Sequence, residues 1–389
     1  MTHLLGDSFA YLILCLIAQA VLILLKVLLR DKINTVVRVV LIALKIFLAI
    51  LMGGLVMMVD APIWWIAPAC TAFYIALFAD TASDVVCLIY DLIGARKNKS
   101  KRVRKWVACV LTAVFSLALV LYGADSVWNV TVNPVTYTSD KLTTQHKFAY
   151  VSDLHIGTAQ PLGVSIEVID TIKEQNVDFV ILGGDVSDEL TTKSEMKAYY
   201  SLFDDLGVPI YFTYGNHDRQ MEADEVFGRT YTDEELEKAI TGDNITIVHD
   251  EAVQLASDLV LVGREDSSQD DRADWEKIAI PDTNAFLLVA DHQPNITNSG
   301  ADLQLSGHIH AGQYWPLCAI GNLMGHEMYG WYSYADGKSV YLGAGESPDA
   351  AVEKGSTALY ISSGVSAWAV PFKTEGGCHI EIVTLNPAN

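Results

Sequence analysis

Hydrophobic positions follow two patterns along the chain, and the change between them comes near residue 130. The first part is a series of long apolar runs that contain few charged side chains. A helix needs about 20 mostly apolar residues to cross the hydrocarbon core of a bilayer. Four runs meet this requirement, so we predict an all-α bundle of about four membrane-spanning helices, over residues 8–29, 37–59, 61–94 and 105–125. The third run is longer than a bilayer needs, and it is expected to form one helix that projects into the cytoplasm.

The charges of residues 1–130 predict how this bundle is oriented. The region contains 12 Lys and Arg and seven Asp, whereas the remainder contains 14 basic and 40 acidic residues. Basic residues flank the first and third connections between the runs, and the second connection and the N-terminal end have none. Because loops rich in Lys and Arg stay in the cytoplasm, both ends of the bundle are expected outside. We therefore predict a multi-pass protein of the cell membrane with an extracytoplasmic domain.

Beyond residue 146 the pattern is that of an α/β domain, which we place at 147–389. A polar segment at 131–146 is interpreted as a linker. Short apolar strands then alternate with helices, which are expected at Leu162–Glu174 and Lys193–Leu206. Nearly continuous apolar strands, such as 178–182, are typical of a parallel sheet that is buried on both faces. The chain ends in further strands, so the domain is expected to be layered.

Polar side chains with metal-binding chemistry follow five of the predicted strands. Open α/β sheets place their sites at the carboxyl ends of strands, so these residues are expected to meet in one crevice. Carboxylate oxygens together with imidazole nitrogens suit Mn, Fe or Zn better than Mg or Ca alone. The five groups are Asp153 with His155, Asp185 with Asp188, Asn216 with His217, His292, and His308 with His310.

In this order, the blocks Asp-x-His, Gly-Asp-x-x-Asp, Gly-Asn-His-Asp, His and Gly-His-x-His resemble the calcineurin-like metallophosphoesterase family. The segment from Asp302 to Gln313 is similar to its YkuE-like, membrane-attached bacterial branch. The resemblance covers roughly residues 147–385 and leaves the apolar N-terminal region unexplained. It implies a layered αββα sandwich and two divalent metal ions, with Mn expected and Fe or Zn as alternatives.

The resemblance also implies a role for each residue. Asp153, His155, Asp185 and His310 would hold the first metal. Asp185 would bridge to the second metal, which Asn216, His292 and His308 would complete. The implied reaction is hydrolysis of a phosphomonoester, phosphodiester or pyrophosphate by a metal-bridging hydroxide. His217 would be the general acid, and Asp188 resembles the carboxylate that orients it. Two departures, Ala311 in place of glycine and an apparent insertion at 339–355, concern substrate contacts more than metal binding.

Alternatives for function and for single residues remain at this stage. Tethering to a membrane favours a lipid-linked or envelope substrate, and a soluble phosphoester fits nearly as well. The acidic charge of the second part disfavours nucleic acid as a partner. A different hypothesis is a transport or signalling protein whose outer metal-binding domain acts as a sensor. A disulfide between Cys318 and Cys378, and a substrate contact by His326, are compatible with the sequence.

Overall fold

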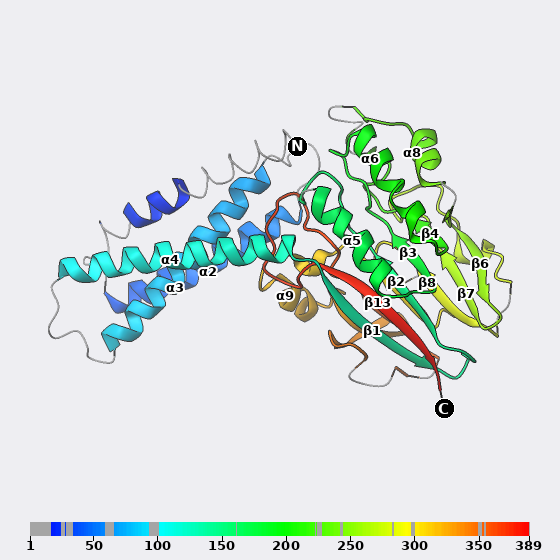
Figure 1. Ribbon diagram of the computed structural model, residues 1–389. Coiled ribbons are helices and arrows are strands. Elements are labelled where there is room, and N and C mark those ends of the chain that lie inside the picture. Colours follow the sequence, from blue (N-terminus) through cyan, green and yellow to red (C-terminus); the bar gives the residue numbers. More distant parts are fainter. Residues whose placement is uncertain are drawn as a thin grey trace.

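The protein consists of a long helical arm and a two-sheet domain, which meet along one side of the domain (Figure 1). The structure is a computed structural model. It describes residues 17–24, 28, 34–58, 66–92, 101–160, 162–221, 223, 228–241, 244–281, 284–296, 300–348, 352–353 and 355–388, with side chains for all of these except 101–105.

Three helices of the arm are long and apolar enough to cross a membrane. They are α2 (Thr35–Val56), α3 (Ala67–Leu92) and α4 (Lys101–Trp128). The 22 residues of α2 span about 33 Å at 1.5 Å per residue, which matches a hydrocarbon core of about 30 Å. Three of the four runs expected to span a membrane thus form long apolar helices, and α3 is one long helix as predicted. The first expected span, 8–29, lies largely outside the described residues, although 17–24 are helical.

Buried charges hold the three helices of the arm together. Lys45 on α2 makes ion pairs with Asp80 and, at 2.7 Å, with Asp84, both on α3. Thr112 on α4 donates a hydrogen bond to the other oxygen of Asp80 at 3.2 Å. The acidic residues that interrupt the apolar pattern of α3 therefore have polar partners on both neighbouring helices.

The segment expected to be a linker begins with a strand instead, and the expectation for 131–146 was wrong over its first part. Strand β1 (Thr131–Ser139) pairs in parallel with β13 (His379–Pro387), the last strand of the chain. Only residues 129 and 130 separate α4 from β1. The polar, β-branched residues of this segment suit the edge of a sheet, where one side of the strand faces water.

Two mixed sheets pack face to face in the outer domain. The first has the order β1-β13-β2-β3-β4-β5 and the second β11-β10-β12-β9-β8-β7-β6. The remaining strands of the first are β2 (His146–Val151), β3 (Phe179–Gly183), β4 (Ile210–Thr213) and β5 (Ile245–Ile247). Those of the second are β6 (Glu251–Ala256), β7 (Leu259–Gly263), β8 (Phe286–Ala290), β9 (Leu303–Ser306), β10 (Gly330–Ala335), β11 (Lys338–Gly343) and β12 (Thr357–Ile361).

The main core lies between the two sheets. Phe148 and Ile181 of the first sheet pack in one buried cluster with Leu261, Leu288 and Tyr360 of the second. A second core lies on the outer face of the first sheet, under α5 (Leu162–Glu174), α6 (Lys193–Tyr200) and α8 (Asp233–Ile240). This confirms the predicted layered α/β sandwich. The expected helix over 193–206 is divided at Ser201 into α6 and a 3₁₀ turn over Phe203–Leu206.

The apparent insertion contains a strand that the pattern did not predict. Residues 339–355 begin inside β11, which forms a hairpin with β10 at the edge of the second sheet. Trp331 on β10 is fully buried and stacks on Tyr137 of β1. This aromatic residue therefore belongs to the core between the sheets.

Candidate metal centre

The predicted polar residues do meet at one end of the two sheets. Asp153 and His155 follow β2, Asp185 and Asp188 follow β3, and His217 follows β4. His292 follows β8, and His308 and His310 follow β9. Each sheet thus contributes loops to the same crevice, as expected for the carboxyl ends of parallel strands.

One group of side chains could hold a first metal ion. The ligand atoms of Asp153, His155 and His310 all lie within 4.8 Å of one another. The two Nε2 atoms of the histidines are 3.2 Å apart, and Nε2 of His310 lies 3.6 Å from Oδ1 of Asp153. Two nitrogens bound at 2.0–2.1 Å to one ion are separated by about 3.2 Å when they subtend about 100° at the metal. The group therefore has the spacing of a chelating site.

A second group lies beside the first, and Asp185 stands between them. Asp185, His292 and His308 also have ligand atoms within 4.8 Å of one another. Oδ2 of Asp185 lies 2.8 Å from Nε2 of His292 and 3.9 Å from Nε2 of His155 in the first group. One carboxylate thus faces both groups, which is the geometry of a bridging ligand.

Three of the histidines are held so that Nε2 points into the centre. Nδ1 of His155 is hydrogen-bonded to Asp188 at 2.8 Å. Nδ1 of His310 contacts the carbonyl of Ser366 at 3.1 Å, and Nδ1 of His292 contacts the carbonyl of Gly183 at 2.9 Å. Such contacts place the proton on Nδ1 and leave Nε2 as the electron-pair donor. The same three imidazoles are fully or almost fully buried.

Two buried oxygen atoms in the centre have no partner within the protein. Oδ2 of Asp153 and Oδ1 of Asn216 are both inaccessible to water and make no hydrogen bond. A buried polar atom without a partner costs free energy of roughly 1–3 kcal/mol. Together with the chelating spacing, these atoms indicate that the residues fit a pair of cations.

The backbone of the centre is held in an uncommon conformation. Asp153, His155, Asp185, His308 and His310 all have left-handed φ values, between 44° and 69°. This conformation costs a non-glycine residue roughly 1–2 kcal/mol. It persists where surrounding contacts determine it, and such residues cluster at functional sites.

Asp218 supplies part of that constraint. Its carboxylate accepts hydrogen bonds from the backbone N–H groups of Asp185, Ser187 and Gly215, at 2.8–2.9 Å. The loops after β3 and β4 are thereby tied to a single side chain. A side chain at Gly215 would lie 2.2 Å from Oδ1 of Asp185, so only glycine lets these loops approach so closely.

Burial and neighbouring charges shift the pKa values of the buried histidines in opposite directions. Burial lowers the pKa of His310 to about 3, and burial with the nearby His292 lowers the pKa of His308 to about 4. Burial also acts to lower the pKa of His292, but the carboxylate of Asp185 outweighs it and raises that pKa to about 10. The carboxylates thus attract positive charge into the centre.

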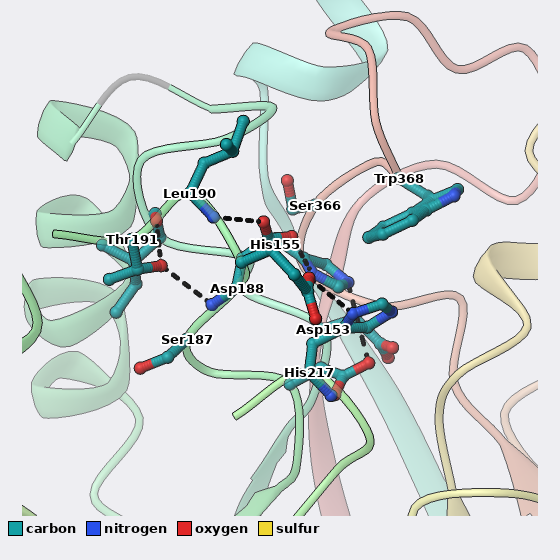
Figure 2. A network of polar contacts seen from close by, with 12 residues as sticks. Asp153, His155, Ser187, Asp188, Leu190, Thr191, His217, Ser366 and Trp368 are labelled. Atoms are coloured by element: carbon teal, nitrogen blue, oxygen red, sulfur yellow. Dashed lines mark hydrogen bonds and ion pairs between the residues drawn. The ribbon is translucent and has the colours of Figure 1, made fainter. Parts of the chain in front are cut away.

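His217 lies at the edge of the centre, and its surroundings differ from the expectation. Its Nδ1 is hydrogen-bonded to Glu189 at 2.7 Å, and its ring stacks on Trp368. Figure 2 shows His217 and Trp368 together with Asp188 and His155. Asp188, which was expected to orient His217, is instead hydrogen-bonded to His155. The two carboxylates are neighbours in an irregular loop, so the spacing of the motif does not reveal which of them reaches which histidine. The sequence analysis assigned neither Glu189 nor Trp368 to His217.

A comparison with protein families identifies this arrangement. Residues 146–312 match the model of the calcineurin-like phosphoesterase family. This part of the chain is therefore similar to calcineurin-like phosphoesterases. The match begins at β2 and ends just after His310, so it contains every strand end that contributes a predicted metal ligand.

Bacterial proteins with similar sequences have low identity to this chain. An uncharacterized metallophosphoesterase of Helicobacter pylori is 25% identical over 258 residues, which cover 64% of this chain and 62% of the relative. YkuE of Bacillus subtilis, also an uncharacterized metallophosphoesterase, is 25% identical over 62% of this chain and 80% of its own length. Phosphodiesterase YaeI of Escherichia coli is 28% identical over 43% of this chain and 61% of its own length.

Other residues with candidate roles have definite places in or near the outer domain. Cys318 and Cys378 are free thiols, so the disulfide between them is not formed. His326 lines the cleft above the centre. Asp291 is buried and paired with both terminal nitrogens of Arg272, at 2.6 and 2.9 Å.

Proposed function

We propose that this protein is a membrane-anchored, dinuclear metallophosphoesterase that hydrolyses a phosphomonoester, phosphodiester or pyrophosphate bond. The observation that carries the proposal is the position of Asp185 between two chelating groups of buried ligands. A family match and partnerless buried oxygens at the same place support it. The chain covers just under two thirds of its first curated relatives, so the assignment is argued from the centre itself.

In this proposal seven residues hold the metals. Asp153, His155 and His310 belong to the first site, Asn216, His292 and His308 to the second, and Asp185 to both. Two divalent cations would supply charge neutralisation for the phosphoryl group and lower the pKa of bound water. Mixed carboxylate, amide and imidazole ligands favour Mn, with Fe and Zn as alternatives.

His217 acts as the general acid in the proposed reaction. It lines the cleft beside Asp185 and Asn216, where an ester oxygen would leave. Glu189 holds Nδ1, so Nε2 is the atom that gives its proton to the leaving oxygen. Asp188 acts through His155 and is assigned a positioning role there. A general acid typically accelerates such a step by about 10²–10⁴.

The arm anchors the domain, and we propose that the domain lies on the extracytoplasmic side. The basic residues of the connection between α3 and α4 support this orientation through the positive-inside rule. It places the enzyme beside lipid-linked and envelope phosphoesters, and away from nucleic acid. A reporter fused to the C-terminus, active only outside the cytoplasm, checks the orientation: an inactive reporter on a well-expressed protein contradicts it.

The central experiment measures metal content and hydrolysis together. The full chain in nanodiscs is loaded with Mn²⁺ and assayed with aryl phosphomonoesters and phosphodiesters, beside the variant Asp185→Asn. We expect about two metals per chain, and loss of both activity and metal in the variant. Asp170→Asn, an exposed carboxylate on α5, is the matched control and should behave as the wild type. Wild-type metal content and activity in Asp185→Asn would overturn the proposal.

A further inference from the structure

The cleft above the metal centre continues beyond the polar residues toward the membrane helices. Its volume is about 680 Å³, which lies in the range of pockets that hold small molecules. One end is formed by the residues of the centre, including Asp185 and His217. The other end is formed by the last residues of α2 and by the short helix α9 (Leu317–Met324).

The residues that α9 and the end of α2 contribute to the cleft are apolar, whereas His326 and Glu327, which follow α9, add polar side chains to its lining. Met57 and Met58 follow the last turn of α2, and Leu317, Ile320 and Met324 come from α9. Methionine side chains are flexible and polarisable, so they adapt to chains of different shape. Met58 is 76% exposed and Met324 is 70% exposed. The free energy falls when another apolar group covers such a surface and removes it from water.

This end of the cleft lies where the membrane-spanning helices leave the bilayer. Helix α2 ends at Val56, directly before the two methionines, and the apolar run continues from them to Val59, just before Asp60. Trp315, just before α9, is 55% exposed and packs against Phe78 of α3, and its carbonyl accepts a hydrogen bond from Tyr74 at 2.8 Å. Tryptophan and tyrosine favour the boundary between membrane and water. The contact between α9 and the arm is visible at the junction in Figure 1.

A second hollow, of about 480 Å³, adjoins the centre on its polar side. Asn216 and Gln293 line both hollows, and the second is completed mainly by polar side chains, among them Gln269 and Asp270. A phosphate at the centre would therefore have an apolar space on one side and a polar space on the other. A phosphodiester that joins a hydrocarbon chain to a polar headgroup matches this division, whereas a monoester would leave one space empty.

We infer that the substrate is a lipid phosphodiester whose hydrocarbon chain lies between the end of α2 and α9. The inference rests on the proposed function and names its substrate class. Hydrolysis adds one water across a P–O ester bond. The water oxygen bonds to phosphorus, and the ester oxygen leaves with a proton from His217. One proton of the water restores His217, and the other remains with the phosphate product.

The test compares esters that differ only in chain length. The full chain in nanodiscs with Mn²⁺ is assayed with methyl and octyl 4-nitrophenyl phosphate, and the ratio of their kcat/KM values is recorded. Full burial of a methylene group improves binding by about 0.8 kcal/mol, or roughly fourfold. With partial burial, we expect the octyl ester to be favoured at least about tenfold.

Variants distinguish the contribution of the cleft to this preference from that of the surrounding bilayer. The bilayer concentrates the octyl ester near every variant equally. In the double variant Met58→Ser with Met324→Ser, the octyl-to-methyl ratio should fall well below that of the wild type, and the part that remains is the effect of the bilayer. The double variant Met58→Leu with Met324→Leu keeps the apolar surface and should keep the ratio. Leu323→Ser is the matched control, because Leu323 is 88% exposed on the same helix and is not part of the cleft lining.

The outcomes distinguish this inference from the proposed function. Hydrolysis that depends on Asp185 but shows no preference for the octyl ester overturns the lipid assignment alone. So does a preference that survives the serine substitutions in protein with wild-type thermal stability. If neither ester is hydrolysed, or if Asp185→Asn hydrolyses both at the wild-type rate, the proposed function fails and the inference fails with it.

Discussion

The indole ring of Trp368 stacks on the imidazole of His217, with 4.4 Å between ring centroids and 28° between the planes. The backbone N–H and carbonyl of Trp368 are both hydrogen-bonded to the side-chain amide of Gln313, at 2.6 and 3.0 Å. Gln313 thus fixes the backbone of Trp368, and with it the position of the indole. It covers one face of the proposed general acid and keeps water from it.

Replacing the indole should therefore change the acid step more than the metal site. We expect Trp368→Ala to slow hydrolysis of esters with poor leaving groups about tenfold, because the imidazole loses its support. Trp368→Phe keeps an aromatic face and should lose much less. The measurement is kcat for a series of aryl esters of increasing leaving-group pKa, with metal content determined alongside. Equal activity of all three proteins across the series would contradict this role.

Glu189 should matter through the same histidine. Glu189→Gln removes the charge that holds Nδ1 of His217 and supports its protonated form. We expect kcat to fall about 10²-fold for poor leaving groups and much less for good ones, with two metals retained. Glu167→Gln, an exposed residue on α5, is the control. A uniform loss across all leaving groups would indicate that Glu189 only maintains the fold.

Asp188 should affect the metal instead. Its carboxylate orients His155, so Asp188→Asn is expected to weaken the first metal site about 10- to 100-fold, as loss of such an outer contact typically does. Titration with Mn²⁺ and a competing chelator measures this directly. Unchanged metal affinity, combined with a changed leaving-group dependence, would assign Asp188 to His217 as the sequence motif suggested.

Glu381 should make the stability of the outer domain depend on pH. Burial between the strands raises its pKa to about 7, and Asn133 and Ser362 donate hydrogen bonds to it at 2.6 and 2.8 Å. The folded state thus prefers the protonated carboxyl. Its contribution to stability is fully present below the unfolded value of about 4.3 and is lost as the pH rises to 7, by about 3 kcal/mol.

Glu381→Gln imitates the protonated carboxyl and should remove that loss. Thermal unfolding of the wild type and the variant, followed at pH 5 and pH 8, tests this. We expect the variant to melt several degrees higher than the wild type at pH 8 and near it at pH 5. A difference of the same size at both pH values would show that Glu381 does not titrate in this range.

The ion pairs of the arm should stabilise the bundle without entering the chemistry. Lys45→Met removes the cation that contacts Asp80 and Asp84, and breaking a buried pair in this way costs about 3–5 kcal/mol. Adding Asp80→Asn and Asp84→Asn should recover much of the stability, measured by thermal unfolding in nanodiscs. Hydrolysis per folded molecule should stay unchanged. Loss of activity in well-folded protein would favour the transport or sensor hypothesis.

The positions of the site residues were predictable because their signal is local. Each group follows a short apolar strand, and parallel strands that end at one edge bring such groups together whatever the details of the loops. Asp185 and His310 were assigned in this way, and the structure places both in the chelating groups. The apolar runs of α2, α3 and α4 carry an equally local signal.

The remaining features depend on contacts between distant parts of the chain. Residues 131–139 were interpreted as part of a linker. They form β1 by pairing with β13, which is distant in the sequence, and the local pattern does not show that pairing. Whether Asp188 or Glu189 reaches His217 depends on the course of an irregular loop. Trp368 reaches the centre from the loop after β12, and no local pattern marks it. The apolar end of the cleft likewise exists only because α9 contacts α2.

The short connection between α4 and β1 determines where the enzyme can work. Residues 129 and 130 are bridged by backbone hydrogen bonds, from Asn129 to Asp125 and from Thr131 to Cys378, and Lys373 bonds to the carbonyl of Gly123. The domain is therefore rigidly connected to α4, with no flexible hinge between them. Under the proposed function, the metal centre would stay at a constant height above the bilayer, so encounters with the proposed lipid substrate would be two-dimensional. Turnover should then follow the surface density of the substrate in the bilayer rather than its bulk concentration.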